Sequence, residues 1–261
     1  MLTDTHAHLT FPDFADDLDG LLARAAEAGV TRIITIGTTL ESSRCAVALA
    51  EKYACVFAAV GIHPDHAMEA APDFLAELRA LAQSPRVVAI GECGFDYFRR
   101  TPERIAAEKS TQTRVFTQQL ELAAELALNV IIHERDAWGD TLAALAPFAG
   151  RVRGQFHCFG KSPAHAAAVL ADGHVVSFTG IVTFKNATLV QETAAQLGAG
   201  AFMVETDCPY LAPVPFRGKR CEPAHTRATA GFIANLRAQP IAALAAETTA
   251  TADAFFSFAR S

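Results

Sequence analysis

The sequence has no C-x-x-C pair and no dense array of cysteines, although it contains six cysteines in 261 residues. Such irregular spacing excludes a disulfide framework and favours free thiols in a reducing compartment. No apolar run approaches the roughly 18 residues that suggest a membrane span, and the chain does not open with a basic segment followed by an apolar one. We therefore expect a cytoplasmic protein that does not associate with membranes.

An excess of positive charge is also missing, because the formal net charge is −6 at pH 7. The protein has no overall positive field to attract nucleic acid, so a polyanionic substrate would need local cations or bound metal. The sequence lacks a Gly/Ser linker, a low-complexity tract and an internal repeat, and 51% of its residues are apolar. These features predict one domain covering residues 1–261 and leave the oligomeric state open, with a monomer as the expectation.

Short β-branched or apolar runs alternate with longer helical stretches along the whole chain. Over residues 16–29, leucines recur on one helical face, and Gly29 follows where a C-cap glycine is expected. Eight strand–helix units in about 260 residues predict a single-domain (β/α)8 TIM barrel of the α/β class. A doubly wound open sheet is the alternative, because periodicity does not show closure. The predicted strands cover residues 2–8, 31–37, 55–63, 86–92, 129–133, 151–157, 174–180 and 201–207.

Ionisable residues collect at the carboxyl ends of these predicted strands. In a parallel barrel those ends face one rim, where the active sites of this fold are built. Because positions i and i+2 share a side of a strand, His6 and His8 should point to the rim together, while Thr5 and Ala7 face away. Asp4 lies deeper with the same parity, where it would accept the ring N–H of a ligand. The residues at these ends are His6, His8, His63, Glu92, His133, His157 and Asp207.

Imidazole and carboxylate groups in this combination predict a metal centre. Such a ligand set suits zinc, manganese or another divalent ion and leaves room for water, as catalytic sites require. Two ions sharing a bridging carboxylate would activate a trapped water, so hydrolysis is the natural reaction. A single histidine is more often structural, but the joint placement at strand ends favours ligands. His66, His165 and His174 lie elsewhere and are expected at the surface.

Six motifs resemble those of one known family in the same order. They are DTHAHL (4–9), VGIHP (60–64), IGECGFDY (90–97), IIHERDA (131–137), FHCFGKS (156–162) and VETDCPYL (204–211). They resemble the TatD family of metal-dependent hydrolases, often described as TatD-type deoxyribonucleases, within the amidohydrolase-like barrels. The resemblance covers essentially the whole chain.

The resemblance also implies a ligand set and a substrate. One divalent ion (Mg, Mn or Zn) would be held by His6, His8 and Asp207, the other by His133 and His157, with Glu92 bridging the two. The implied reaction is cleavage of phosphodiester bonds in DNA, commonly from a 3′ end, by a hydroxide held between the ions. Asp207 would orient that nucleophile or take its proton, and His63 would donate to a phosphate oxygen.

Substrate contacts are less defined than metal ligands. Arg135 would bind phosphate or form an ion pair with Glu205 or another acid, and both interpretations stay open. Arg217, Lys219 and Arg220 form a local cationic patch after the last strand, although such charge runs are often solvated faces. Tyr97, Phe98 and Trp138 are core residues or base-stacking residues. The positions that depart from the family pattern are Thr10, Phe95, Asn129, Gly139, Phe216 and Cys221.

Two other functions remain as alternatives. Related barrels cleave ester or amide bonds in small-molecule or aminoacyl-type substrates, often with a carbamylated lysine on the fourth strand. Glu92 occupies the corresponding position here, which favours the nuclease-like branch. A binding scaffold without catalysis is disfavoured, because no ligand of the predicted set is missing. Cys93, Cys158 and Cys208 neighbour the ligands on the opposite side of each strand and are expected to be packing residues.

Overall fold

The computed structural model describes residues 1–256 and 258, in which eight parallel strands form one sheet in chain order. The strands are β1 (Leu2–Ala7), β2 (Val30–Ile36), β3 (Val56–Val60), β4 (Val87–Asp96), β5 (Asn129–Arg135), β6 (Gly154–Phe156), β7 (Val175–Phe178) and β8 (Phe202–Val204). The backbone after β8 meets the end of β1, because Asp207 N–H donates to His6 O at 2.8 Å and His8 N–H donates to Cys208 O at 2.9 Å. This order confirms the predicted barrel and excludes a doubly wound sheet.

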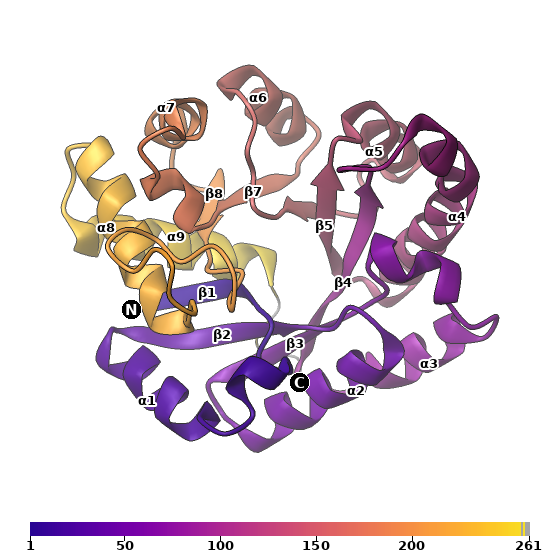
Figure 1. Ribbon diagram of the computed structural model, residues 1–261, viewed down its shortest axis with the longest axis horizontal. Coiled ribbons are helices and arrows are strands. Elements are labelled where there is room, and N and C mark those ends of the chain that lie inside the picture. The colour runs from indigo at the N-terminus through magenta and orange to yellow at the C-terminus, as the bar shows by residue number, and fades with distance from the viewer. Residues whose placement is uncertain (257, 259–261) are drawn as a thin grey trace.

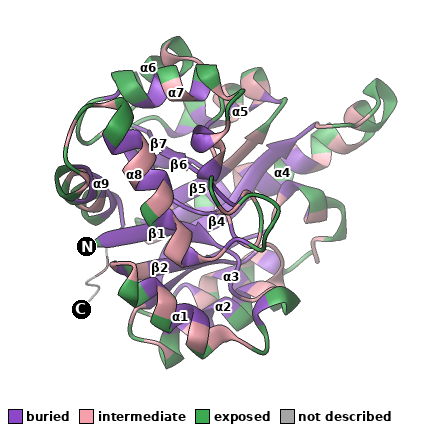
Figure 2. Cartoon of the chain, turned by 60° about the vertical axis from the view of Figure 1, so that its left-hand side comes forward, coloured by how far each residue is buried: buried purple, intermediate pink, exposed green. Residues whose placement is uncertain are grey.

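Helices between the strands surround the barrel, with their exposed faces outward and the strands buried inside (Figures 1 and 2). They are α1 (Leu18–Glu27), α2 (Leu40–Lys52), α3 (Phe74–Leu81), α4 (Pro102–Leu126), α5 (Trp138–Leu145), α6 (Pro163–Ala171), α7 (Thr188–Gln196), α8 (Thr226–Leu236) and α9 (Ile241–Phe255). α1 confirms the helix predicted over 16–29, and Gly29 after it takes the left-handed φ of +83°. No helix in the described residues is long and apolar enough to cross a membrane.

The inner residues of the strands form a separate apolar cluster inside the barrel. Ile131 of β5 and Met203 of β8 belong to it, and Phe255 at the end of α9 packs into the same cluster. Polar residues lie further toward the carboxyl end of these strands, as His133 does within β5, or directly after it, as Glu205 does after β8. The apolar layer thus forms a floor beneath the site.

β4 and β5 extend beyond their predicted ends at residues 92 and 133. Cys93–Asp96 pairs with Ile132–Arg135, so each strand supports the other past the level of its neighbours (Figure 1). Glu92 therefore lies inside β4, next to a shift in the pairing register, rather than at the strand end. The expected position of Glu92 is corrected accordingly, because pairing between neighbours, not residue type, decides where a strand ends.

β1 contains a second irregularity. Its register with β2 slips by one residue between Asp4 and Ala7. The Thr5 hydroxyl consequently donates to Glu205 Oε2 at 3.3 Å, and Gln155 Nε2 donates to Thr5 at 3.1 Å. The prediction that Thr5 faces away from the site is wrong, because an extra residue in a strand interrupts the simple alternation of sides.

Candidate metal centre

The predicted ligand residues converge at the carboxyl ends of the strands, around a cavity of about 420 Å³. His6 lies completely buried behind it, and the remaining predicted ligands line its wall. The wall residues are His8, Phe11, Thr38, His63, Asp65, His66, Glu92, Asp96, His133, Arg135, His157, Asp207 and Tyr210. Strands far apart in the sequence thus contribute to one polar cavity, as the barrel predicts.

The Glu92 carboxylate turns one oxygen toward His6 of β1 and His8 directly after it. Glu92 Oε2 lies 3.3 Å from His6 Nε2 and 3.8 Å from His8 Nε2. Asp207 closes this group, because its Oδ1 lies 3.6 Å from His6 Nε2 and 3.2 Å from His8 Nε2. Two imidazole nitrogens and two carboxylate oxygens therefore face a common point.

The other oxygen of Glu92 faces a second group of histidines. Glu92 Oε1 lies 2.7 Å from His133 Nδ1 and 2.8 Å from His157 Nε2. His63 Nε2 lies 3.6 Å from the same oxygen. One carboxylate thus joins two distinct sets of imidazoles, each provided by different strands.

The donor atoms fit divalent metal. His6 Nε2 is buried and has no hydrogen-bond partner in the described part of the chain, although it faces two carboxylates. Donors that share one ion at 2.0–2.2 Å lie roughly 3 to 3.6 Å apart, close to the spacing around Glu92 and Asp207. In the described residues, three overlapping triplets have their ligand atoms within 4.8 Å of one another: His6–His8–Glu92, His63–Glu92–His133 and His6–His157–Glu205.

The electrostatics of the cluster favour ionised carboxylates. Burial opposes the charge of Glu92, but His157 and His6 outweigh it and hold the Glu92 pKa well below its usual value. Burial likewise opposes the charge of Asp207, whose pKa is lowered by His8 and His6. A pair of ionised acids among imidazoles is a site that binds cations.

The chain matches one protein family along nearly its whole length. Residues 3–257 fit the family model of the TatD related DNases. The chain belongs to this family. An uncharacterized metal-dependent hydrolase of Bacillus subtilis, YabD, is 38% identical over 98% of this chain and 99% of its own length.

Two further relatives extend the comparison. A protein of Erwinia billingiae named 3′-5′ ssDNA/RNA exonuclease TatD is 35% identical over 97% of this chain and 98% of its own length. The crystal structure of the TatD homologue YJJV from Escherichia coli K12 superposes with a TM-score of 0.90, at 30% identity over 98% of both chains. This TatD-family protein is therefore a metal-dependent hydrolase with an amidohydrolase-like barrel.

Asp4 does not accept the ring N–H of a predicted ligand, as the sequence suggested. It accepts hydrogen bonds from the Thr206 N–H at 2.9 Å, the Thr206 hydroxyl at 2.7 Å and the His6 N–H at 3.3 Å, but from no imidazole ring in the described residues. The prediction was wrong because the slip in β1 turns Asp4 toward the segment after β8. Asp4 instead fixes the backbone next to Asp207.

Carboxylates behind the rings come from two residues that the sequence did not single out for this role. Asp96 Oδ2 lies 2.9 Å from His133 Nε2, and Glu205 Oε1 lies 3.6 Å from His157 Nδ1. Burial would lower the pKa of His133, but its hydrogen bonds to Asp96 and Glu92 raise it to about 8. The signal in the sequence was the presence of both acids in the family motifs.

His63 is a neutral ring with a defined donor. Burial, together with the neighbouring His133, lowers the pKa of His63 to about 3. Its Nδ1 accepts a hydrogen bond from the Asp65 N–H at 3.1 Å, so its proton resides on Nε2. His63 Nε2 lies 3.6 Å from Glu92 Oε1, and His63 lines the cavity.

Arg135 reaches the cavity, as its parity with His133 predicts. Its guanidinium stacks on the Phe98 ring at 3.6 Å, and the side chain is exposed. Glu205 is not its partner, because the Glu205 oxygens accept hydrogen bonds from Cys158 N–H at 2.6 Å and Gln155 Nε2 at 2.8 Å. The ion pair considered between Arg135 and Glu205 is therefore wrong.

The predicted cationic patch lies outside the cavity wall. Arg220 donates to Asp17 at 2.9 Å, and Arg217 stacks on the Phe184 ring at 3.8 Å. Lys219 is exposed, and among the described residues none of these three cations lines the cavity. Their role in binding substrate stays a prediction.

Aromatic residues at the rim differ from those that the sequence suggested. Phe11 stacks on His8 at 4.8 Å and meets Tyr210 edge-on at 6.0 Å, and both line the cavity. Each lies three residues after a predicted ligand, His8 or Asp207, and this spacing was the available signal in the sequence. Tyr97 is buried with its hydroxyl on Asp140 at 2.8 Å, so it does not stack with substrate. Among the predicted aromatics, Phe98 supports Arg135, and Trp138 packs on Phe156 and Phe159.

Other expectations concern histidines and cysteines outside the ligand set. His174 is buried and accepts the Gly154 N–H at 2.9 Å, so its expected surface position is wrong. His66 lines the cavity, whereas His165 is exposed. Cys93 and Cys208 are buried, as expected for packing residues, and burial raises the pKa of both thiols.

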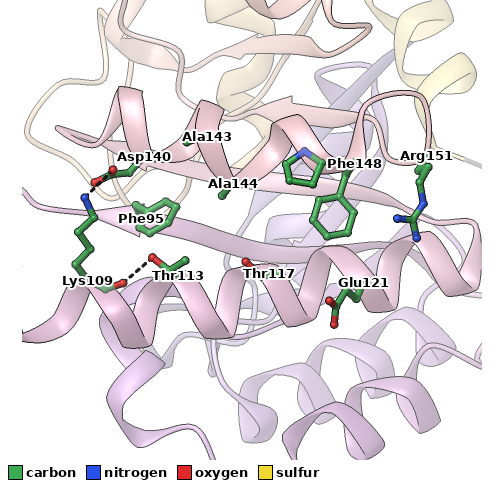
Figure 3. Close-up of a pocket in the computed structure, with 11 residues that line it drawn as sticks. Phe95, Lys109, Thr113, Thr117, Glu121, Asp140, Ala143, Ala144, Phe148 and Arg151 are labelled. Carbon is green, nitrogen blue, oxygen red and sulfur yellow. Dashed lines mark hydrogen bonds and ion pairs between the residues drawn. The ribbon is translucent and has the colours of Figure 1, made fainter.

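A larger cavity, of about 590 Å³, lies on the outside of the barrel between α4 and α5 (Figure 3). Phe95, Phe148 and threonines of α4 line it, and Lys109 pairs with Asp140 at 2.8 Å across one end. Among the described residues, no histidine and none of the metal-site triplets belongs to its wall. The candidate metal centre is therefore the smaller cavity.

Proposed function

We propose that this TatD-family hydrolase cleaves phosphodiester bonds of DNA from the 3′ end, using two divalent ions (Mg, Mn or Zn) held around Glu92. The observation that supports this proposal most directly is that the two oxygens of Glu92 face different groups of histidines. The printed name of the Erwinia relative, a 3′-5′ ssDNA/RNA exonuclease, supports the choice of substrate. The free thiols favour a cytoplasmic location, and a monomer remains our expectation.

The proposed ligands divide between the two groups. His6, His8 and Asp207 would hold one ion and His133 and His157 the other, with Glu92 between them. When bound, such a pair polarises phosphoryl oxygens and makes water a nucleophile near neutral pH. The remaining steps depend on groups of the protein itself.

Asp207 is the group best placed to take a proton. Its side chain is 15% exposed, against 3% for Glu92, so Asp207 reaches water in the cavity more readily. Because its pKa is lowered, Asp207 is an ionised acceptor at neutral pH. We assign it the orientation of the attacking water and the acceptance of its proton.

His63 and Arg135 would hold the scissile phosphate. The neutral His63 ring donates from Nε2 into the cavity without adding charge. Arg135, at the end of β5, adds positive charge to the cavity wall, with its guanidinium stacked on the Phe98 ring. Together they provide an orienting donor and a cation in an otherwise acidic protein.

Bases of a single strand would stack on the aromatic rim. Tyr210 is 55% exposed beside the cavity, and Phe11 supports its edge. Stacking contributes roughly 1–3 kcal/mol per base without requiring a basic groove. Arg217 and Lys219 are exposed on the next loop and would contact more distant phosphates, whereas Arg220 would first have to leave Asp17.

The proposal is tested with single-stranded DNA labelled at its 5′ end. After chelation and resupply of Mg²⁺ or Mn²⁺, wild type should shorten the strand in a ladder from the 3′ end. Glu92→Ala and His133→Ala should lose this activity by roughly 10²-fold or more, as loss of a charge-stabilising group typically costs. Glu125→Ala, which removes an exposed acid paired with Arg79, is the matched control. Intact DNA with metal-loaded wild type would contradict the proposal and direct the search to ester and amide substrates.

A further inference from the structure

The two histidines beside Glu92 Oε1 present opposite ring nitrogens to it. His133 presents Nδ1 at 2.7 Å, whereas His157 presents Nε2 at 2.8 Å. A neutral imidazole that binds an ion with one nitrogen carries its proton on the other. His133 must therefore be the Nε2–H tautomer and His157 the Nδ1–H tautomer. A different neighbouring group must therefore stabilise the tautomer of each ring.

Asp96 stands behind His133. Its Oδ2 lies 2.9 Å from His133 Nε2, and its Oδ1 accepts the Phe98 N–H at 2.8 Å, so the carboxylate is fixed in orientation. The backbone of Asp96 is also held from α4, because its N–H donates to Gln112 Oε1 at 3.2 Å. This carboxylate can accept only from a ring that is protonated at Nε2.

Glu205 stands behind His157. It is completely buried, and its Oε1 lies 3.6 Å from His157 Nδ1. The carboxylate is fixed by Cys158 N–H at 2.6 Å and by Gln155 Nε2 at 2.8 Å. In the described residues His157 Nδ1 has no hydrogen-bond partner, so Glu205 is the acceptor aimed at it.

His6 of β1 and His8 directly after it lack such support. The Nδ1 atoms of His6 and His8 are buried, and neither has a hydrogen-bond partner among residues 1–256 and 258. Their group instead contains the Asp207 carboxylate directly. Glu92 gives one oxygen to each group. The first group has the Asp207 carboxylate in addition, whereas the second group has further acids only behind its rings.

We propose that Asp96 and Glu205 are positioning residues that select the tautomers of His133 and His157 and so set the affinity of the ion held by these rings. Each accepts the proton of the nitrogen that faces away from the ion and makes the opposite nitrogen more basic. The inference rests on the proposed two-ion function. Asp96 and Glu205 should both influence the same ion, the one that His133 and His157 would hold.

Metal affinity is the first test. Metal-free full-length protein is titrated with Zn²⁺ in competition with a chromophoric chelator. Wild type should bind two ions, and Asp96→Ala and Glu205→Gln should each weaken one of them by about 10- to 100-fold, with the other unchanged. Asp96→Asn, which keeps an acceptor oxygen without the charge, should fall between wild type and Asp96→Ala. Asp140→Asn removes a nearby acid that contacts Tyr97 and Lys109, and should leave both affinities unchanged.

A tautomer measurement separates positioning from general damage to the fold. In ¹⁵N-histidine NMR spectra of the Zn²⁺-loaded wild type, we expect His133 protonated at Nε2 and His157 at Nδ1. Asp96→Ala should alter only the His133 signals, and Glu205→Gln only those of His157. Two bound ions in wild type, with both affinities and tautomers unchanged in the two variants, would overturn this inference alone. Fewer than two ions in wild type would instead contradict the proposed function.

Discussion

At the scale of single residues, the site depends on the exposure and orientation of a few side chains. Glu92 is 2% exposed and touches both histidine groups, so it is a structural link as well as an ionised acid. Around it, His63 and Arg135 reach the cavity without belonging to the proposed ligand set. Substitutions at the cavity wall should therefore separate substrate binding from metal binding.

Tyr210→Ala should weaken binding of single-stranded DNA but not of a small phosphodiester. Because a stacked base contributes roughly 1–3 kcal/mol, KM for DNA should rise on the order of 10-fold. Hydrolysis of bis(4-nitrophenyl) phosphate, which carries no nucleobase, should keep its kinetic constants. An equal loss on both substrates would show that Tyr210 supports the metal centre and not the bases.

Arg135→Ala should make DNA binding weaker and less dependent on salt. The log–log slope of affinity against salt should shrink by about one, as for the loss of one phosphate contact. Arg151 is a matched control, since it also stacks on an aromatic ring, Phe148, but lines the outer cavity. If Arg151→Ala reduced the slope as much as Arg135→Ala, the assignment of Arg135 would be wrong.

At the scale of secondary structure, the paired ends of β4 and β5 hold His133, a proposed ligand of the second ion, together with Asp96 behind its ring. Gly94 makes this extension possible, because it adopts φ +145° and a Cβ there would lie only 2.0 Å from His133 O. The close approach places the His133 backbone against β4. The backbone conformation of Gly94 should therefore affect the position of His133 in the proposed metal centre.

Gly94→Ala should destabilise the fold and weaken metal binding. A residue forced into this backbone region costs of order 1–3 kcal/mol, and the contact with His133 O adds to it. Gly139→Ala, near the start of α5 with open space around the new methyl group, should be neutral or slightly stabilising. Urea unfolding and Zn²⁺ titration of both variants provide the measurement. Wild-type metal affinity in a folded Gly94→Ala variant would refute the coupling.

The pairing register of the strands explains which features of the barrel and the site could be predicted from the sequence and which could not. Alternation and strand spacing predicted the barrel and the convergence of the ligands. The orientation of Asp4 and Thr5 was wrong because a one-residue slip in β1 leaves no mark in residue types. The contacts of Asp96 and Glu205 could not be predicted either, since they depend on how neighbouring strands are paired.

At the scale of the whole molecule, metal should act as a folding ligand. The cluster draws on strands from both ends of the chain, so bound ions would connect β1 with the segments after β6 and β8. Ligand at 100 times its Kd stabilises a fold by about 2.7 kcal/mol per site. Chelation should thus lower Tm by about 5 °C or more. In differential scanning calorimetry, Tm of Glu92→Ala should depend less on Zn²⁺ than Tm of wild type, because each group loses one ligand. A wild type insensitive to chelation would contradict this expectation.

The most direct test of the central claim is electron paramagnetic resonance of the protein loaded with Mn²⁺. If Glu92 joins two ions, wild type should bind two Mn²⁺ and give the broad spectrum of an exchange-coupled pair. Glu92→Ala should lose this coupling and show only the hyperfine-split spectrum of isolated Mn²⁺. A fully loaded wild type that gives only the isolated spectrum would contradict a Glu92-bridged pair.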